Sequence, residues 1–414
     1  MTLIEFFDKT PIENLIASLA LQPDRTIFVG ADSRRVIRAL PLYRRILENH
    51  DIHTDIWSKT VARNDIEGII AALENIMSDA SEDYVIDISG GDESSLVALG
   101  IILGTTDKNV AAFRIDPVTR QGIWFDPAFD DSGKRSVERA LMDFSAGQVR
   151  LTIKENVALH GGKIYGESNL FGRGEPVVYD IDELWKHCCA DPAGWNATIN
   201  RFSASVEQSP DDANSFSIMP DVIGKRGGID PELWRFITDR GFVIRESLKN
   251  DSQRQYFRYK NKQVRDCLTK AGSLFEYYVY KSALYSEIDG KPVFSDATTG
   301  ITLGWNDDAD TTRNEIDVML MNGVMPVFIS CKNGDIKTDE LYKLTAVSER
   351  FGSAYAKYAL AGTVFFDSSA KTYLGDSTVN NIRNRAADMN IKLIECAHNM
   401  KPGELQQAII ELIK

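Results

Sequence analysis

Three residues whose types suit phosphodiester chemistry stand in order in the last third of the sequence: Glu276, Asp317 and Lys332. Glu276 is the only charged residue in the stretch 271–280. A carboxylate in such an apolar setting needs a cationic partner or a metal ion. A glutamate on the solvent face of a helix would explain the residue equally well. The residue alone therefore leaves both interpretations open.

Asp317 lies near the start of a predicted strand, 316–321. The alternation there puts Glu315 and Asp317 on one side of the strand and Ile316 and Val318 on the other. Because aspartate is depleted inside strands, its place in an otherwise apolar strand indicates a functional role.

Lys332 follows a second apolar run, 325–330. Taken alone, it is best explained as a lysine that ends a strand and keeps its charged head in water. The pair Asn322-Gly323 separates the two predicted strands and is a strong hairpin signal. The hairpin would lay the strands side by side and bring Asp317 near Lys332.

A helical glutamate, a strand aspartate, a hairpin turn and a strand ending in lysine together resemble the core of the PD-(D/E)xK nucleases. Phosphodiester cleavage needs an activated water, charge stabilisation and a stabilised leaving oxygen, and one or two Mg²⁺ or Mn²⁺ ions can supply all three. Hard cations prefer carboxylate oxygens, here those of Asp317 and Glu276. The resemblance further implies that Cys331 lends its main-chain carbonyl to the metal and that Lys332 holds the water or the transition-state phosphate.

The sequence departs from this family at Ser330, a candidate catalytic residue by position. A second acidic residue normally stands there, two positions before the lysine, and a hydroxyl is a poor substitute for a metal-binding carboxylate. Either Glu276 or Glu315 compensates, or the metal is held loosely. An inactive nuclease is the less favoured alternative.

Strand-like and helix-like runs alternate over residues 1–150, which predicts an α/β domain with a mostly parallel, doubly wound, Rossmann-like sheet. The predicted strands are 3–7, 26–30, 54–57, 84–88, 110–115 and 122–125, and the predicted helices 11–21, 34–48, 66–77, 93–103 and 136–144. A second α/β unit follows, with helices 264–285, 338–350, 378–389 and 403–413 and strands 301–305, 316–321, 325–330, 361–366 and 391–395. Doubly wound sheets bind ligands at the carboxyl ends of their strands, where the strand order reverses.

Residues 87–93 form a predicted strand-to-helix turn that contains Gly90 and Gly91. Two glycines allow the backbone to approach a ligand, and the helix N-terminus offers free N–H groups to a phosphate. Plain tight turns use such pairs too, and no dinucleotide or ATP fingerprint occurs. The turn is similar to the ligand loop of CARF domains, the CRISPR-associated Rossmann-like sensors, and the segment 10–14 resembles the opening loop of one branch.

Joined to the segments 257–260, 268–272 and 329–332, the chain resembles the CARF–nuclease fusions of type III CRISPR systems. The resemblance implies a homodimer that encloses one cyclic oligoadenylate, with cyclic tetra-adenylate as the expected ring. Binding would close the nuclease domains on single-stranded DNA and RNA, with duplex DNA as a further candidate. The implied ligand contacts are Thr10, Asn14, Ser89, Gly90, Gly91, Asp92 and Glu93. The two acidic residues are expected to meet adenine or ribose donors, or to cap the helix.

The predicted domains are a CARF domain at 1–150, a connecting segment at 151–255 and a nuclease domain at 256–414. A helix from Pro231 and two strands, 242–246 and 255–259, resemble a small wing-like module. It would bind nucleic acid or only connect two domains, and the connector is favoured. Cations interleaved with aromatic residues over 254–265 suit either a phosphate groove with base stacking or a solvated hairpin face.

The net charge of −13 argues against broad, unspecific duplex binding but permits a local basic groove. The five cysteines form no zinc spacing with the five histidines, so free buried thiols are expected. No apolar run approaches the ~18 residues that span a bilayer, and the N-terminus lacks a signal-peptide pattern. We expect a cytoplasmic protein with no membrane partner. The alternatives to an activated nuclease are a ligand-controlled nucleic-acid-binding regulator without cleavage and a restriction-type endonuclease whose N-terminal domain only dimerises.

Overall fold

The computed structural model describes residues 1–414 except 80, 107, 130–134, 146, 247–252, 305–312, 335 and 364–375. The chain divides into two compact units. The first holds Met1–Gly162 and the short segments Met321–Met325 and Phe351–Tyr355, and the second holds Lys163–Leu320, Pro326–Arg350 and Ala356–Lys414. The first unit thus ends at Gly162 rather than near residue 150. Residues 163–255 share a unit with most of the predicted nuclease domain.

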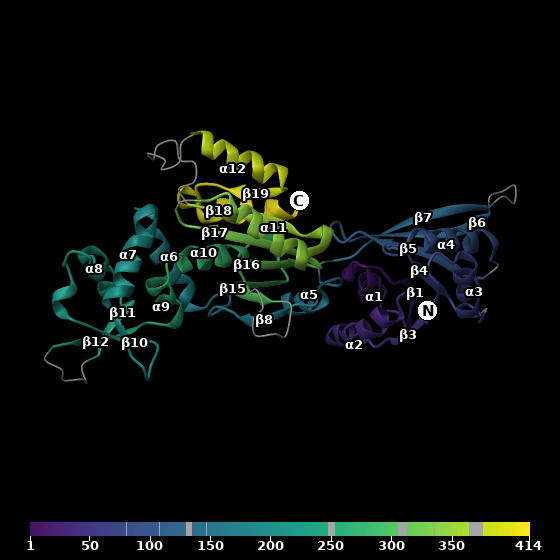
Figure 1. Cartoon of the computed structure of the whole chain (residues 1–414), viewed down its shortest axis with the longest axis horizontal. Coiled ribbons are helices and arrows are strands. Elements are labelled where there is room, and N and C mark those ends of the chain that lie inside the picture. The colour runs from purple at the N-terminus through teal and green to yellow at the C-terminus, as the bar shows by residue number, and fades with distance from the viewer. Residues whose placement is uncertain are drawn as a thin grey trace. The chain divides into compact units, whose positions relative to one another are not determined.

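A seven-stranded sheet forms the centre of the first unit, in the order β3-β2-β1-β4-β5-β6-β7 (Figure 1). Its strands are β1 Thr2–Phe6, β2 Arg25–Gly30, β3 Asp55–Thr60, β4 Tyr84–Asp87, β5 Val110–Ile115, β6 Gln121–Phe129 and β7 Arg135–Asp143. The first five are parallel, and β6 and β7 are antiparallel. The chain runs outward from β1 through β2 and β3 and then returns to β4. The strand order therefore reverses between β1 and β4, where a ligand crevice is expected.

Helices cover both faces of this sheet. Side chains along β1 point alternately to one face and to the other. Ile4 and Phe6 share a core cluster with α3 (Ile66–Ile76) and α4 (Glu93–Thr105). Glu5 points to the opposite face, where Ser18 of α1 (Ile16–Leu21) donates to it. With α2 (Ser33–Asn49) and α5 (Ile153–Leu159), these helices complete the unit. The predicted mostly parallel, Rossmann-like fold is confirmed.

Two helices predicted for the first unit differ in the structure: one is a strand and the other is divided in two. Residues 136–144 are not a helix: β7 pairs antiparallel with β6 along its whole length, and this pairing outweighs the helix-forming residues of that segment. The predicted helix 11–21 is a 3₁₀ turn, Pro11–Asn14, followed by α1. The break falls at Leu15, whose φ of −134° is not helical.

A six-stranded sheet forms the centre of the second unit, in the order β19-β18-β17-β16-β15-β8. Its strands are β8 Lys163–Gly166, β15 Asp296–Gly304, β16 Asn314–Asn322, β17 Met325–Lys332, β18 Lys357–Gly362 and β19 Ile391–Ile394. The turn between β16 and β17 contains Gly323 at φ +64°, a backbone conformation that favours glycine. The predicted hairpin is thus present. The ends of two predicted strands, at 305 and 364–366, lie outside the described residues.

The helices around this sheet are α10 Ser273–Leu284, α11 Asp339–Gly352, α12 Asp376–Asp388 and α13 Pro402–Ile410. The predicted long helix 264–285 is in fact two helices, α9 (Lys262–Thr269) and α10. The chain turns between them at Gly272, whose φ is +98°, so no helix can continue through it. The break sets the direction of α10, which carries Glu276.

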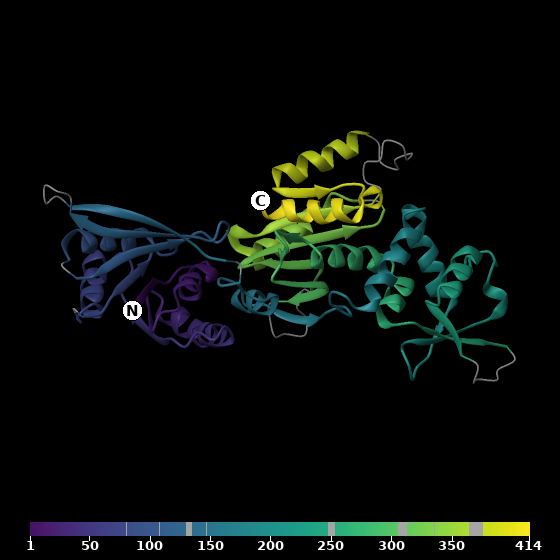
Figure 2. The same cartoon turned by 180° about the vertical axis from the view of Figure 1, so that it is seen from behind.

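Residues 176–269 form what we call the helical module, part of the second unit (Figure 2). It contains α6 Pro176–Cys188, α7 Pro192–Ser205, α8 Pro231–Asp239, α9 and a sheet in the order β11-β12-β10-β9, made of Val243–Glu246, Gln255–Tyr259, Ser215–Ile218 and Glu207–Gln208. The predicted wing-like helix and strands are present, but β10 and β9 extend the pair into a four-stranded sheet. The predicted turn 250–252 lies outside the described residues.

Across the described part of the chain, no helix combines the length and the hydropathy that a membrane span requires.

Candidate active site and ligand loop

Asp317 lies in β16 with its carboxylate against the end of β17. Its Oδ2 accepts three hydrogen bonds: from the main-chain N–H of Cys331 at 2.6 Å, the hydroxyl of Ser330 at 3.0 Å and Nζ of Lys332 at 3.4 Å. The hairpin therefore brings Asp317 and Lys332 together. Ser330 is bound to the acidic residue rather than facing a cation as a second acid would.

The main-chain carbonyl of Cys331 faces the β16 side of its strand. The carbonyl of Lys332 accepts from the N–H of Thr363, which follows β18. Successive carbonyls of a strand point to opposite edges, so the Cys331 carbonyl points away from β18. It lies on the same edge as its own N–H, which meets Asp317. This position suits the metal-binding role that the resemblance implies for it.

Lys332 is held between two carboxylates. Its Nζ lies 3.4 Å from Oδ2 of Asp317 and 3.4 Å from Oε2 of Glu340. Glu340 belongs to the first turn of α11. Burial alone would lower the pKa of Lys332, but these two carboxylates outweigh it and raise the pKa above its usual value. Lys332 is therefore a fixed positive charge at neutral pH.

Glu276 lies in the first turn of α10, and its side chain folds back over Gly272. A Cβ added to Gly272 would lie 3.3 Å from Oε1 of Glu276. Burial and the nearby carboxylates of Asp317 and Glu315 raise the pKa of Glu276 to about 8. The sequence therefore gathers acidic groups whose mutual repulsion a bound cation would relieve. Glu276 is not among the residues that line the cleft described below.

The donor set fits a magnesium-like ion only as an open site. Within the described residues, no three histidine, cysteine, aspartate or glutamate side chains are grouped to hold a metal. Mg²⁺ keeps several waters and binds proteins through one or two carboxylates plus substrate phosphates. Asp317 and the Cys331 carbonyl are donors of the kind that such an open site uses, and Glu276 is a candidate further carboxylate.

A cleft of about 390 Å³ opens beside β16, β17 and α11. It contains both acidic and basic side chains, which suits a phosphate and the cation that neutralises it. Its charged lining residues are Arg313, Glu315, Asp317, Lys332, Glu340 and Lys343. Sequence reasoning missed Arg313, Glu340 and Lys343. Glu340 and Lys343 stand in the first two turns of the helix after Lys332, and that proximity was the available signal.

The two predicted ligand loops meet where the strand order of the first unit reverses, after β1 and after β4. A Cβ added to Gly90 would lie 2.9 Å from Cβ of Asp8 and 3.3 Å from the carbonyl of Phe6. Gly91 has φ +100°, a conformation that side chains rarely adopt. Both glycines are therefore required by the close approach of the loops.

Some predicted ligand contacts have other partners within the protein. Asn14 is buried; its Oδ1 accepts from the N–H of Asp8 at 2.6 Å, and its Nδ2 donates to Asp8 O at 3.0 Å and Tyr43 Oη at 3.2 Å. The Ser89 hydroxyl donates to Asp87 at 2.8 Å and accepts from the N–H of Ile115 at 3.1 Å. The hydrogen bonds of both side chains hold the loops in place. They shape the crevice rather than offer free groups to it.

Asp92 caps α4, accepting from the N–H and hydroxyl of Ser95. Glu93 is exposed and Thr10 is partly exposed at the same crevice edge. Arg35, in the first turn of α2 and missed by sequence reasoning, donates to the carbonyl of Lys9 at 3.0 Å. It supplies a cation beside the β1 loop, which a phosphate-bearing ligand needs.

The basic and aromatic run at 254–265 does not form a free phosphate groove. Four of its five cations pair with acidic residues of the module: Arg254 with Glu207, Arg258 with Asp212 and Glu246, Lys260 with Asp180, and Arg265 with Asp266. The fifth, Lys262, is exposed. The aromatic residues Phe257 and Tyr259 of the run are buried in the core. The paired charges of this run serve the fold of the module.

The first unit is a Rossmann-like α/β unit, and the second is an α/β unit whose β16–β17 hairpin carries Asp317 and Lys332. The predicted fold is confirmed by solved structures. The chain resembles protein VC1899 from Vibrio cholerae with a TM-score of 0.67 at 17% identity, over 100% of this chain and 97% of that one. It resembles Can2 from Sulfobacillus thermosulfidooxidans, solved in complex with cyclic tetra-adenylate, with a TM-score of 0.60 at 16% identity, over 100% and 97%. No family model and no curated protein matches the sequence.

Proposed function

We propose that the chain is a metal-dependent nuclease activated by a cyclic oligoadenylate, expected to be cyclic tetra-adenylate, and that it serves as an ancillary effector of type III CRISPR defence. The observation that carries the nuclease assignment is that the β16–β17 hairpin places Asp317 beside Lys332. Burial and the negative charge of Asp317 raise the pKa of Glu276, which links this carboxylate to the same site. The activator is supported by the reversal of strand order between β1 and β4, where doubly wound sheets bind ligands, and by the fold shared with Can2, whose structure holds cyclic tetra-adenylate.

The side chains have separate roles in this reaction. Asp317, Glu276 and the Cys331 carbonyl would hold Mg²⁺ or Mn²⁺, which supplies charge neutralisation and an acidified water. Lys332, kept cationic by its two carboxylate neighbours, places a positive charge beside the scissile phosphate. Arg313 and Lys343 line the same cleft and would hold the flanking phosphates of single-stranded DNA or RNA.

A homodimer is supported by α4, which is apolar on every side. Leu96, Val97 and Ile101 are 42%, 50% and 42% exposed, and a Cβ added at Gly100 or Gly104 would meet no atom within 4 Å. A helix that is hydrophobic all round is normally buried. A second copy of the chain, related by a two-fold axis, would cover this face and place two crevices around one cyclic ligand.

The test uses the full chain with labelled single- and double-stranded DNA and RNA, with and without Mn²⁺ and cyclic tetra-adenylate. We expect cleavage only when both are present. Cleavage without the ligand would favour a restriction-type enzyme that needs no activator. Tight ligand-dependent nucleic-acid binding with no cleavage under any condition would sink the nuclease proposal.

That last outcome is the second candidate function, a ligand-controlled nucleic-acid-binding regulator. One observation favours it: Ser330 stands where a metal-binding acid is expected and donates to Asp317 instead. The same cleft would then hold phosphates without hydrolysing them.

A further inference from the structure

The residue directly after Lys332 is held by the helical module. Nδ2 of Asn196, in α7, donates to the main-chain carbonyl of Asn333 at 2.6 Å. Nδ2 of Asn333 donates in return to Oδ1 of Asn196 at 3.2 Å. These two hydrogen bonds tie α7 to the end of β17, at the position where Lys332 leaves the strand.

Asn333 is also held from the side of the sheet. The hydroxyl of Thr363 donates to its Oδ1 at 2.7 Å, and the N–H of Thr363 donates to the carbonyl of Lys332 at 3.2 Å. Asn333 therefore links β18 on one side to α7 on the other. The backbone that carries Lys332 is fixed between them, so the loss of Asn196 would free one side only.

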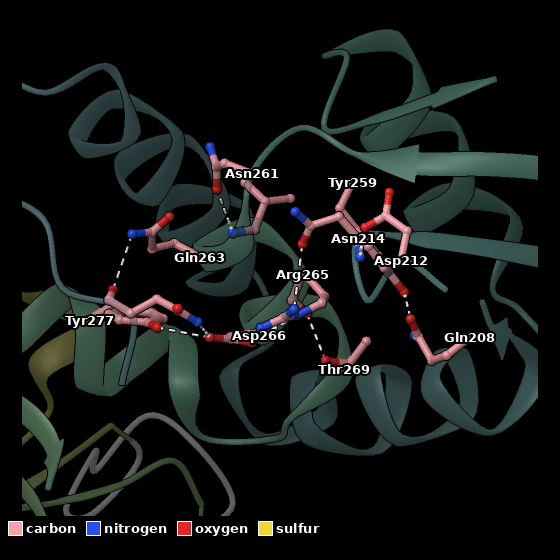
Figure 3. A network of polar contacts seen from close by, with 12 residues as sticks. Gln208, Asp212, Asn214, Tyr259, Asn261, Gln263, Arg265, Asp266, Thr269 and Tyr277 are labelled. Carbon is pink, nitrogen blue, oxygen red and sulfur yellow. Dashed lines mark hydrogen bonds and ion pairs between the residues drawn. The ribbon is translucent and has the colours of Figure 1, made fainter. Parts of the chain in front are cut away.

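A second anchor leads from the module to α10, which carries Glu276. Asp266, in α9, is 97% buried, and its carboxylate accepts from four donor atoms. Arg265 gives two of these bonds to Oδ1, while Nδ2 of Asn169 at 2.6 Å and the hydroxyl of Tyr277 at 3.0 Å share Oδ2. Figure 3 shows Asp266 between Arg265 and Tyr277 in this network. Tyr277 is the immediate neighbour of Glu276.

The two anchors belong to one continuous apolar core. Trp195 and Ile199 of α7 and Val264 of α9 lie in the same cluster as Val327 and Ile329 of β17. Side chains in such a core resist small displacements because the interior is closely packed. A displacement at either anchor is therefore expected to displace the backbone of the active site as well.

We propose that the helical module, residues 176–269, is a positioning scaffold of the active site: Asn196 positions Lys332 through Asn333, and Asp266 positions Glu276 through Tyr277. This assigns a role to a region that the sequence left as a wing or a connector. It rests on the proposed nuclease function. Positioning has large kinetic effects, because a displacement near 1 Å can cost on the order of 10²-fold in rate.

The first experiment compares Asn196→Ala with Asn200→Ala. Asn200 lies four residues further along the same helix and is exposed, so it matches the change in helix propensity. We expect Asn196→Ala to lower the single-turnover rate at saturating nucleic acid by roughly 10- to 100-fold, with the half-saturating concentration unchanged. Asn200→Ala should cleave like the wild type.

A readout without catalysis is amide hydrogen exchange at Thr363, whose N–H meets the Lys332 carbonyl. Exchange there should speed up in Asn196→Ala and not in Asn200→Ala. Should Asn196→Ala fail to fold, Asn196→Asp takes its place, because it keeps an oxygen that can accept from Asn333 and replaces the donor by a carboxylate oxygen that faces the Asn333 carbonyl. Unchanged rate and unchanged exchange in the folded variant overturn the role of Asn196.

The second experiment compares Tyr277→Phe with Tyr280→Phe in α10. Each removes one buried hydroxyl bond, to Asp266 or to the carbonyl of Phe171, both at 3.0 Å. Only Tyr277→Phe should weaken Mn²⁺ binding, by roughly 3- to 10-fold in a calorimetric titration without substrate. Equal effects of the two variants contradict the role of Asp266.

These readouts separate the two proposals. If the wild type cleaves nothing with Mn²⁺ and cyclic tetra-adenylate, the nuclease function fails. The exchange rates and the Mn²⁺ titrations still decide whether the module positions the two elements.

Discussion

The hydroxyl of Ser330 lies 3.0 Å from Oδ2 of Asp317 and donates a hydrogen bond to it. PD-(D/E)xK nucleases, which the hairpin resembles, normally carry an acid at this position; here a hydroxyl that donates to Asp317 stands in its place. Among the described residues, all the hydrogen bonds to the Asp317 carboxylate go to Oδ2, which leaves Oδ1 for a cation. The proposed site therefore has one strand carboxylate, Asp317, and we propose Glu276 as its second acid.

Replacing Ser330 by aspartate would restore the missing acid. The new carboxylate adds a hard oxygen ligand, so Ser330→Asp should bind Mn²⁺ roughly tenfold more tightly. Without metal, the new carboxylate lies beside that of Asp317, and the hydrogen bond from the Ser330 hydroxyl is lost. Both changes should lower the free energy of unfolding, by about 1–3 kcal/mol. Denaturant titrations with and without Mn²⁺ measure both effects.

Ser330→Ala is the control, because it removes the donor without adding a charge. It should lower stability slightly and leave Mn²⁺ affinity within about twofold of the wild type. Equal Mn²⁺ affinities of Ser330→Asp and Ser330→Ala would show that position 330 does not face the cation.

We propose that Lys332 supplies a positive charge to the reaction, whereas Lys343 in the same cleft is 70% exposed and pairs with Glu340. Lys332→Met keeps the length of the side chain and removes its charge. Cleavage should fall on the order of 10²-fold or more, while affinity for cyclic tetra-adenylate stays the same. Lys343→Met should cost only a few-fold, measured as single-turnover rates under the same conditions. Similar losses in the two variants would mean that the cleft needs charge in general rather than Lys332.

The active-site hairpin was predictable because its information is local. Asn322-Gly323 specifies the turn, and the alternation on β16 specifies which side Asp317 faces. The break before α10 was missed: the sequence predicts one helix over 264–285, whereas Gly272 at φ +98° interrupts it. The strand β7 was missed because its partner β6, not its own residues, decides its conformation.

Side-chain roles that depend on distant partners could not be predicted. Asn14 and Ser89 have the right positions for a ligand loop, but Tyr43 and Ile115 occupy their polar groups. A single sequence carries no sign of such pairs. The same reason hid Asn196, whose partner lies more than a hundred residues later.

A pair of buried acids lies beneath the ligand crevice and should make stability depend on pH. Glu5 and Asp87 are register partners across β1 and β4, and both are buried. Burial and their mutual repulsion raise the pKa of Glu5 well above its usual value, and burial raises the pKa of Asp87 to about 6. The folded chain thus binds more protons than the unfolded chain above about pH 4. Stability should therefore fall as pH rises from about 4 through 6.

Asp87→Asn removes one of these acids and keeps an oxygen that can accept from Ser89. Its free energy of unfolding should change less between pH 5 and 7.5 than that of the wild type, by about 1–3 kcal/mol. Urea titrations at the two pH values measure the difference. The reasoning is wrong if both proteins lose the same stability over this interval.

The exposed apolar face of α4 predicts how the first unit associates. Val97 is 50% exposed on this helix, and a second copy would bury it. Val97→Glu should therefore turn a dimer into a monomer in sedimentation equilibrium, because an unpaired charge at a closed interface is costly. It should also lower affinity for cyclic tetra-adenylate by at least about tenfold, since the ring is expected to contact two copies.

Ile37→Glu is the matched control, because Ile37 is 60% exposed on α2 of the same unit. It introduces the same charge on a surface that we do not expect to pair, so it should remain dimeric and bind the ligand like the wild type. A Val97→Glu protein that stays dimeric would place the interface elsewhere. If Ile37→Glu alone dissociates, α2 rather than α4 is the helix that a second copy covers.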